Sequence, residues 1–437
     1  MRRTPPATGS GPVDGPAAGS ASPADRASTA APVVPTGRRY VQLVLVLGAL
    51  ISIGPLTIDM YLPALPELAD ELDAGDAAVQ VTLTGMLAGL ACGQLFLGPL
   101  SDALGRRRPL LVGVVVHAGA SLLCALAPDV VSLSAVRVLQ GFAGAAISVN
   151  AMAIVRDLFV GIAAARLLSR LMLVIGAAPV LAPSLGGLIL QYTSWRGIFV
   201  VLAGFALVLA AVAAVGLRET LPPQRRRSAR PMATLRTYRS LLRDGTFVAL
   251  VLVAGLMMSA LFSYISGSPF VFQEIYGLSQ RDYGLVFGGN ALGIVLGTQL
   301  NPLLLRRFRP SQILTAAVLV ATAGGTVLVV VTATGFAGLV GVLVPLVLIV
   351  GCCGLALPNT PALALSRHGE AAGTAAALLG SVQFGVGAFT APLVGLLGTG
   401  TPVPMAAVIL CGTGLAGVLL LTVVRRDVHV DTAQSAD

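Results

Sequence analysis

Twelve apolar runs, most of them free of charged residues, dominate the sequence of 437 residues. Each is about twenty residues long, the length at which an α-helix crosses the roughly 30 Å hydrocarbon layer of a bilayer. A soluble domain carries roughly 25% charged residues, whereas this chain carries 11%. We therefore predict an all-α integral membrane protein with twelve transmembrane helices. The runs cover residues 41–64, 77–100, 109–127, 131–154, 167–190, 196–217, 247–270, 283–305, 311–333, 337–359, 371–397 and 403–424.

Arginines are distributed unevenly among the connectors between these runs. One alternate set of connectors holds clusters such as 106–108, 225–227 and 306–309, whereas the other set holds Arg196, Arg281 and little else that is basic. Basic residues accumulate in the cytoplasmic loops of membrane proteins. We expect a multi-pass protein of the plasma (inner) membrane with both termini in the cytoplasm.

Long polar segments divide the chain into five parts. Residues 1–38 are rich in Pro, Ala, Gly and Ser, a composition that cannot bury enough apolar surface to fold, and we expect a disordered cytoplasmic tail. The connector 218–246 separates 39–217 from 247–424, which we predict to be two six-helix bundles, and 425–437 to be a second cytoplasmic tail.

Short motifs recur between the two predicted bundles. Residues 182–186 read Ala-Pro-Ser-Leu-Gly and residues 391–395 read Ala-Pro-Leu-Val-Gly; an arginine cluster followed by Pro ends at 109 and again at 310. These matches indicate an internal duplication. Transporters built from repeated helical units bind solute at the repeat interface near mid-membrane.

Several function classes are disfavoured by residue usage. All 28 basic residues are Arg, so the chain has no Gly-Lys-Ser/Thr phosphate loop. The basic residues lie in short connectors and not on one solvated domain, which argues against nucleic-acid binding. Five cysteines lie in apolar runs without Cys-x-x-Cys spacing and three histidines are scattered, so we expect no metal and no cofactor. No segment combines a nucleophile, a base and oxyanion donors, and we expect no enzyme.

Two charged side chains inside the runs, Asp59 and Arg137, are candidates for proton coupling. A charge within a membrane helix costs roughly 2.5–3.5 kcal/mol on insertion scales, so it usually faces a cavity or a partner. Burial favours a protonated carboxyl and a nearby cation favours the ionised form, so alternating exposure would let Asp59 load and release a proton. Both residues lie at a similar depth from the outer end, which permits direct or indirect coupling. The alternatives are that Asp59 caps a helix end before Pro63 and that Arg137 extends to the membrane surface.

Other polar and large side chains in the runs are candidates for a substrate cavity. Each can equally make a helix–helix hydrogen bond. Together they indicate a large, mostly apolar cavity suited to lipophilic compounds. The candidates are Tyr61, Gln94, Gln140, Asn150, Met152, Phe262, Tyr264, Asn290, Asn359, Gln383 and Phe384.

The connector after the second run reads Gly98-Pro-Leu-Ser-Asp102-Ala-Leu-Gly105-Arg-Arg. It resembles the signature loop of the major facilitator superfamily, Gly-x-Leu-x-Asp-Arg-x-Gly-Arg-Arg. The resemblance implies a conformational switch in which the loop's acid holds the two bundles together on the cytoplasmic side. Ala103 departs from the pattern, where a basic residue is usual. The matching residues are Gly98, Leu100, Asp102, Gly105, Arg106 and Arg107.

Two further motifs resemble the same superfamily. Arg137-Val-Leu-Gln140-Gly is similar to its fourth-helix motif Arg-x-x-Gln-Gly, whose Arg is associated with proton coupling. The fifth run is similar to the antiporter motif Gly-Pro-x-x-Gly-Gly of drug exporters, with Ala182 in place of the first Gly. That motif favours export over import. The antiporter residues are Pro179, Pro183, Gly186 and Gly187.

Five segments narrow the resemblance to the Bcr/CflA drug-resistance branch, over about residues 40–425. The resemblance implies a two-bundle, twelve-helix fold and a monomer that exchanges protons for a small lipophilic drug of the bicyclomycin or chloramphenicol kind, with Asp59 lining the central cavity. A proton-coupled importer of a small metabolite and a non-transporting membrane sensor are the alternatives. The segments are Thr57–Pro66, Arg156–Phe159, Trp195–Phe199, Glu219–Leu221 and Ser266–Phe270.

Overall fold

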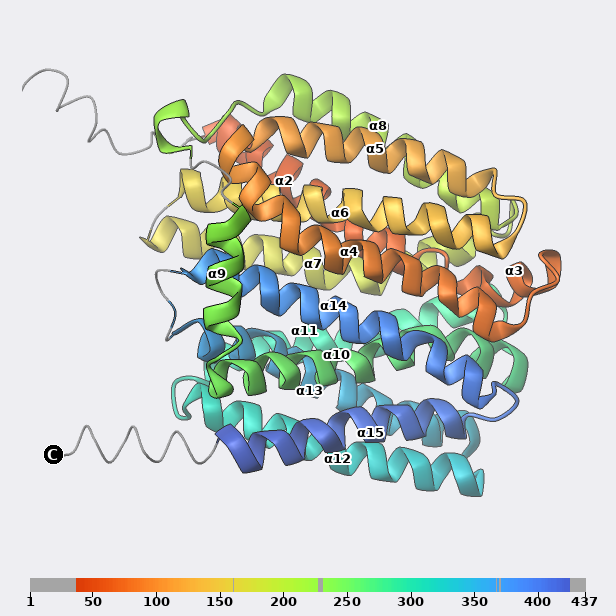
Figure 1. Ribbon diagram of the computed structural model, residues 1–437. Helices are drawn as coiled ribbons and strands as arrows, with labels where there is room; N and C mark the ends of the chain where they lie inside the picture. The colour runs from red at the N-terminus through yellow and green to blue at the C-terminus, as the bar shows by residue number, and fades with distance from the viewer. Residues whose placement is uncertain (1–36, 160, 227–230, 367, 369–370, 425–437) are drawn as a thin grey trace, which may run out of the picture. The chain divides into compact units, whose positions relative to one another are not determined.

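The structure is a computed structural model that describes residues 37–159, 161–226, 231–366, 368 and 371–424. Helices and turns account for the secondary structure of these residues, without a strand (Figure 1). The twelve long helices of the described part are α2 (Gly37–Asp59), α4 (Asp76–Leu104), α5 (Arg107–Ala125), α6 (Val130–Leu158), α7 (Gly161–Ile189), α8 (Trp195–Gly216), α10 (Gly245–Pro269), α11 (Gln280–Leu304), α12 (Pro310–Thr334), α13 (Gly338–Ser366), α14 (Ala372–Leu397) and α15 (Val403–Leu419).

The twelve predicted runs correspond one to one with these helices, and the prediction of an all-α membrane fold is confirmed. Eleven helices of the described residues are long and apolar enough to cross a membrane. The twelfth, α7, has a shorter apolar stretch, Val174–Ile189. Residues 1–36 of the predicted N-terminal tail and all of the predicted C-terminal tail 425–437 lie outside the described residues.

The first run differs from its prediction at the outer end. Helix α2 stops at Asp59, and a short η1 (Leu62–Ala64) and α3 (Leu65–Glu71) continue the chain. A proline ring clashes with the carbonyl four residues earlier, and Pro63 puts that clash at Asp59. The acid therefore occupies the last position of α2, not a position one turn inside a longer helix.

The same helix pairs pack together in each half of the chain. In the first half α4 packs against α6, α5 against α8 and α2 against α7; in the second half α11 packs against α13, α12 against α15 and α10 against α14. A polar contact recurs as well, because Ser101 Oγ donates to Asn150 Oδ1 at 2.5 Å and Asn359 Nδ2 donates to Asn301 Oδ1 at 2.5 Å. The predicted duplication is thus matched by a repeated packing pattern.

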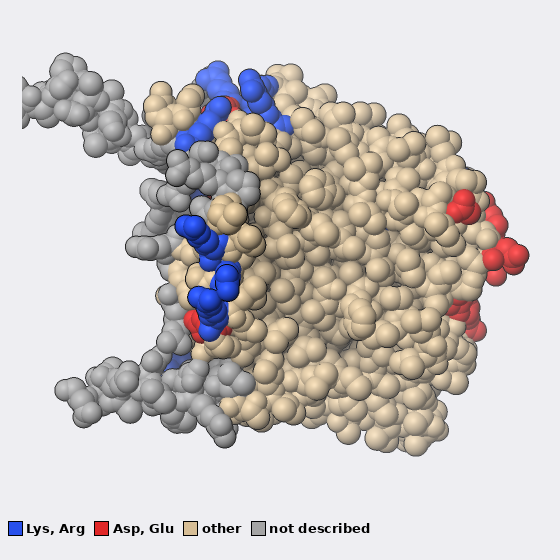
Figure 2. Space-filling model, viewed as in Figure 1, with Lys and Arg blue, Asp and Glu red and all other residues tan. Residues whose placement is uncertain are grey.

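The two halves meet along two seams, one between α4 and α14 and one between α7 and α11. Between the halves, the connector contains η2 (Pro223–Arg225) and a helix, α9 (Pro231–Leu241), that runs across the ends of the spans (Figure 1). Basic and acidic side chains gather at opposite ends of the spans (Figure 2). Figure 2 shows basic side chains at the end where α9 lies, called here the arginine-rich end, and acidic side chains at the opposite, acidic end.

Glycines bring α4 and α6 unusually close. A Cβ built on Gly141 would lie 2.0 Å from Met86 O, and one built on Gly89 would lie 2.1 Å from Val138 O. Small residues allow helix backbones to approach in this way within a bilayer. The two glycines serve the same contact from opposite helices.

We predict that Gly141→Val lowers the thermal unfolding midpoint of the purified protein in detergent. The added side chain meets backbone atoms that cannot rotate away, and overpacking of this kind costs about 1–3 kcal/mol. The measurement is the midpoint of a thermal melt followed by tryptophan fluorescence or aggregation. Gly204→Val on α8 is the matched control, because a Cβ there meets nothing within 4 Å. Equal midpoints for the two variants would contradict the packing argument.

Candidate functional site

Hydrogen bonds between the halves close the acidic end. Gln80 Nε2 donates to Ser266 O at 3.3 Å, and Gln80 Oε1 accepts from Gly395 N at 2.8 Å. Thr84 Oγ1 donates to Ala388 O at 3.0 Å. Gln80 is fully buried, although it lies only one turn inside α4. The first seam is therefore polar, dry and tightly packed at this end.

The second seam uses the antiporter motif of α7. A Cβ on Gly187 would lie 2.6 Å from Gln280 O, and one on Gly284 of α11 would lie 2.6 Å from Pro183 O. Ser184 Oγ donates to Gly284 O at 3.0 Å. Gly186 packs instead against its own half, since its Cβ would lie 1.8 Å from Met60 O. The motif thus contributes close backbone approach at the acidic end, together with one side-chain hydrogen bond from Ser184.

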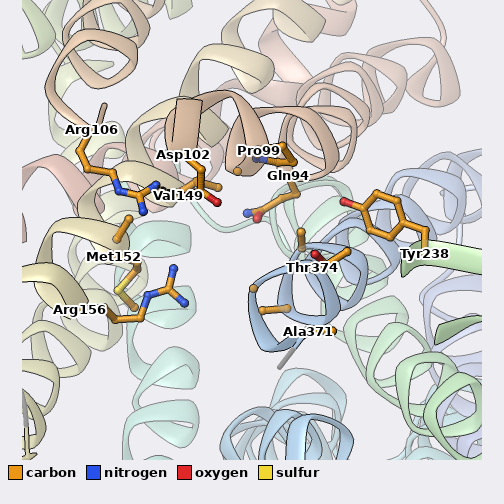
Figure 3. A pocket seen from close by; sticks show the side chains of 16 residues that line it. Gln94, Pro99, Asp102, Arg106, Val149, Met152, Arg156, Tyr238, Ala371 and Thr374 are labelled. Atoms are coloured by element: carbon orange, nitrogen blue, oxygen red, sulfur yellow. Dashed lines mark ion pairs between the residues drawn. The ribbon is translucent and has the colours of Figure 1, made fainter. Parts of the chain in front are cut away.

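A cavity of about 460 Å³ lies at the arginine-rich end, between the two halves (Figure 3). Its walls come from the last turns of α4, from α6, from α9 and from the first turns of α14. Polar side chains project into it from both halves, and Figure 3 shows Asp102, Arg106 and Arg156 facing Thr374 across the space. The main lining residues are Gln94, Gly98, Pro99, Asp102, Arg106, Ser148, Val149, Met152, Arg156, Tyr238, Ala371 and Thr374.

The segment Gly98–Arg108, called here the switch loop, is held to its own half by Arg106. The guanidinium pairs with Asp102 at 2.6 Å and with Asp157 at 3.1 Å, at the end of α6. It also donates to Ser101 Oγ at 2.9 Å. Asp102 remains nearly half exposed on the cavity wall, so part of its carboxylate is available to another partner.

Glu219 holds the turn of the same loop from the other side. Its carboxylate accepts from Arg106 N at 2.8 Å and from Arg107 N at 3.3 Å. Gly105 adopts φ +93°, and a Cβ there would lie 2.4 Å from Glu219 Oε2, so only glycine fits. Partial burial by itself raises the pKa of Glu219, but backbone N–H donors, with Leu221 first among them, outweigh it and lower the pKa below its usual value.

Asp59 is buried at the end of α2 and makes no hydrogen bond or ion pair with a described residue. Its side chain is 4% exposed and its Oδ1 has no partner. The carboxylate lies within electrostatic range of Tyr264 on α10 and Tyr283 on α11. Tyr264 and Asn290 are buried next to each other in the same region, and their polar atoms make no well-formed hydrogen bond with a described residue. The acid therefore lies close to the opposite half of the chain.

Arg137 is fully buried and lies within its own half. One guanidinium nitrogen donates to Gln140 Oε1 at 2.8 Å and to Thr57 O at 3.1 Å. The guanidinium carbon lies 4.4 Å above the Tyr61 ring, a cation–π distance. His117 bridges the same group, with Nε2 3.1 Å from Thr57 Oγ1 and Nδ1 3.3 Å from Gln140 O.

The link between Asp59 and Arg137 is indirect. No ion pair joins them in the described part of the chain, yet Arg137 contacts Thr57 and Tyr61, which lie two residues before and two residues after the acid. A change in the position of Arg137 would therefore move the backbone that carries Asp59. Of the two geometries that the sequence permits, the structure has the indirect one.

The candidate cavity residues separate into groups. Gln94 and Met152 line the cavity at the arginine-rich end, whereas Gln383 lines a small void within the second half. Phe262 and Phe384 are ring neighbours at 6.2 Å. The others are buried between helices, where Tyr61 bonds Thr82 and Gln140 bonds Ser121; these are Tyr61, Gln140, Asn150, Tyr264, Asn290 and Asn359.

Sequence reasoning missed several residues of these sites. His117 stands in an apolar run without a nearby polar pattern, so no sequence signal shows its contact with Thr57. Asp157 and Glu219 carry a weak signal, because both belong to segments of the Bcr/CflA resemblance. Their place beside the switch loop follows only from the three-dimensional packing of α6 and α8 against α5.

The described residues form twelve apolar helices in two repeated sets of six, closed at one end and hollow at the other, which is the architecture of a two-bundle membrane transporter. The family model of the Major Facilitator Superfamily matches residues 45–392, and the chain belongs to this superfamily. Its members are transporters, a class without enzymatic activity.

Known relatives support the drug-resistance branch. The chain is 39% identical over 380 residues to the uncharacterized MFS-type transporter YdgK of Bacillus subtilis, covering 86% of this chain and 93% of that protein. It is 32% identical over 362 residues to the bicyclomycin resistance protein homolog of Haemophilus influenzae, covering 83% and 91%. The crystal structure of a D-xylose–proton symporter has the same fold, with a TM-score of 0.69 at 18% identity over 87% of this chain and 97% of that one.

We predict a pH-dependent role for Glu219 in stability. Its lowered pKa means that the ionised carboxylate stabilises the fold above the ordinary Glu pKa of about 4.3, and that this contribution is lost as pH falls through the lower native pKa. Glu219→Gln should therefore lower the thermal midpoint at pH 7, and the difference from wild type should shrink at acid pH.

The control is Asp70→Asn, an exposed carboxylate at the acidic end, which should leave the midpoint unchanged at both pH values. A Glu219→Gln effect that is constant from pH 7 to the acid range would show that the charge of Glu219 is not its cause.

Proposed function

We propose that this protein exports lipophilic drugs or antibiotics from the cell in exchange for protons, by alternating access of a central site. The observation that carries the proposal is Asp59, a buried carboxylate that has no partner among the described residues and lies within electrostatic range of Tyr264 and Tyr283 in the opposite half. An isolated buried charge is costly, and protonation or hydration removes the cost. A site opened alternately to the two sides would therefore take up a proton on one side and release it on the other.

Arg137 is proposed to couple this proton to the conformational change. Its guanidinium carries a permanent charge and bonds the carbonyl of Thr57, two residues from Asp59. When the acid ionises, the attraction between the two charges increases and favours a movement of the last turn of α2. The short helix η1 that follows this turn contacts α10 and α11, so the movement would be transmitted to the second half.

The switch loop is proposed to act in the opposite conformation. Asp102 stands on the cavity wall facing the first turn of α14, where Ala371 and Thr374 lie. A helix N-terminus attracts a carboxylate. Closing the cavity would bring Asp102 to that N-terminus while the seam at the acidic end separates.

The direction of transport rests on three supports. The arginine-rich end is proposed to be cytoplasmic, as the positive-inside rule implies, so the described cavity opens toward the cytoplasm. The antiporter motif at Pro183–Gly187 is similar to that of exporters. A relative of 32% identity is named for bicyclomycin resistance. Transport as a monomer, with both termini in the cytoplasm, completes the proposal.

We predict that Asp59→Asn abolishes proton-driven drug movement while leaving the protein inserted. In everted vesicles an acidic lumen should drive drug accumulation by the wild type, because protons leaving the lumen are exchanged for drug. Asp59→Asn should show no acceleration by the pH gradient, since the amide cannot bind and release a proton. Drug fluorescence or radiolabel in the vesicles gives the measurement.

Asp73→Asn is the matched control, because Asp73 is exposed at the acidic end and its left-handed backbone (φ 47°) suits Asn. It should transport like wild type. A gradient effect of opposite sign would indicate an importer, and no movement of any drug tested would favour a sensor. Full gradient-driven export by Asp59→Asn would refute the assignment of the proton site.

A further inference from the structure

Helix α9 presents an exposed face that is both apolar and basic. Met232, Leu235 and Leu242 are 63%, 60% and 57% exposed, and Leu242 lies in the turn directly after the helix. With 3.6 residues per turn, these side chains fall on the same face as the exposed Arg236 and Arg239. On a helix that faces only water, three large exposed aliphatic side chains within eleven residues would bring no stabilisation.

The opposite face of α9 attaches the helix to the transporter. Tyr238 Oη donates to Leu95 O of α4 at 3.1 Å, and Tyr238 lines the cavity. Leu241 is buried, and the helix packs against α14. Figure 1 shows α9 crossing the ends of the spans, and Figure 2, from the same side, shows basic side chains along that end beside the broad uncharged surface of the spans.

The arginines of this face are not neutralised by the protein. Helix α9 contains no acidic residue. Asp244, which follows it, accepts from Thr246 N at 3.0 Å and from Phe247 N at 3.2 Å, and lies 3.0 Å from His368 Nε2. Among the described residues, Arg236, Arg239 and Arg243 have no ion pair or hydrogen-bonded partner for their side chains. Three uncompensated positive charges therefore remain at the level where the spans end.

We propose that the exposed face of α9 binds the anionic phospholipid headgroups of the leaflet at the arginine-rich end. Aliphatic side chains of an in-plane helix insert at the headgroup–acyl boundary, and arginines beside them bind lipid phosphates. Guanidinium groups suit this role because they match phosphate oxygens with two N–H donors. Lipid bound to this face would keep α9 beside the mouth of the cavity, where Tyr238 of α9 contacts α4.

The test places an environment-sensitive fluorophore on α9 in the full-length protein. Leu235→Cys is labelled in a background in which the exposed Cys92 and Cys411 are replaced by Ser, and the protein is reconstituted in nanodiscs. Headgroup-proximal spin-labelled lipid should quench the fluorophore more strongly in discs that contain phosphatidylglycerol than in discs of phosphatidylcholine alone. Met232→Cys provides a second labelling position if Leu235→Cys does not fold.

A triple variant should be quenched equally in the two kinds of disc, since three charges at a membrane surface account for roughly a hundredfold in binding. It carries Arg236→Gln, Arg239→Gln and Arg243→Gln. The matched control, Arg306→Gln, Arg307→Gln, Arg309→Gln, removes the same charge from the same end and should keep the difference. Added inorganic phosphate should not reproduce it.

Three outcomes would overturn the proposal. The wild type could be quenched equally in the two lipids, or both triple variants could lose the lipid-dependent difference in quenching to the same extent. Soluble phosphate could also have the same effect as the anionic lipid. Signals that are insensitive to lipid but respond to an added cytosolic protein fraction would also overturn it, in favour of a protein partner. The readout does not depend on transport, so its failure is distinguishable from a failure of the proposed drug export.

Discussion

Asp59 is a buried carboxylate with no hydrogen-bond or ion-pair partner among the described residues, and this constrains the rest of the structure. In a layer without water, a lone carboxylate cannot remain ionised at low cost, so its surroundings must change whenever its proton leaves. Tyr264 and Tyr283 of the second half lie within electrostatic range of it, and the Tyr264 hydroxyl and the nearby Asn290 amide also lack a well-formed hydrogen bond with a described residue. The site is a gap in the hydrogen bonding between two rigid bundles, and such a gap is satisfied by water, by a proton or by a polar group of a substrate.

Polar contacts within each half differ from those between the halves. Within the halves, the paired bonds at Asn150 and Asn359 join side chains of two helices of the same half. Between the halves, the bonds of Gln80 and Ser184 end on backbone groups. Two further bonds at the acidic end join side chains across the halves, since Gln280 Nε2 donates to Glu67 Oε2 at 2.9 Å and Thr399 Oγ1 donates to Asp76 Oδ2. The interface at this end therefore combines backbone-directed bonds with side-chain pairs, and the proposed opening of the acidic end would have to break both kinds.

Much of the fold could be predicted from the sequence, because run length and charge content directly reflect the thickness of the bilayer. The depth of Arg137 within its span was also predictable, whereas Asp59 lies at the end of α2 and not inside a longer helix. The directions of the two side chains were not predictable, since the apolar residues surround each span and leave no clear polar face to orient it. Only the packed structure shows that Asp59 lies close to the second half while Arg137 bonds Gln140 and Thr57. Helix α9 escaped prediction for a different reason: it lies in a polar connector where composition suggests only a linker.

The ionic contacts of the switch loop differ chemically from the surroundings of Asp59 at the end of α2. Arg106 stays charged at any physiological pH, and the pKa of Glu219 is held below its ordinary value. The contact of Glu219 with the backbone of Arg106 and Arg107 therefore keeps its negative charge at pH values where a carboxyl of ordinary pKa begins to take up protons. A moderate change in acidity would leave the turn between α4 and α5 held as firmly as before.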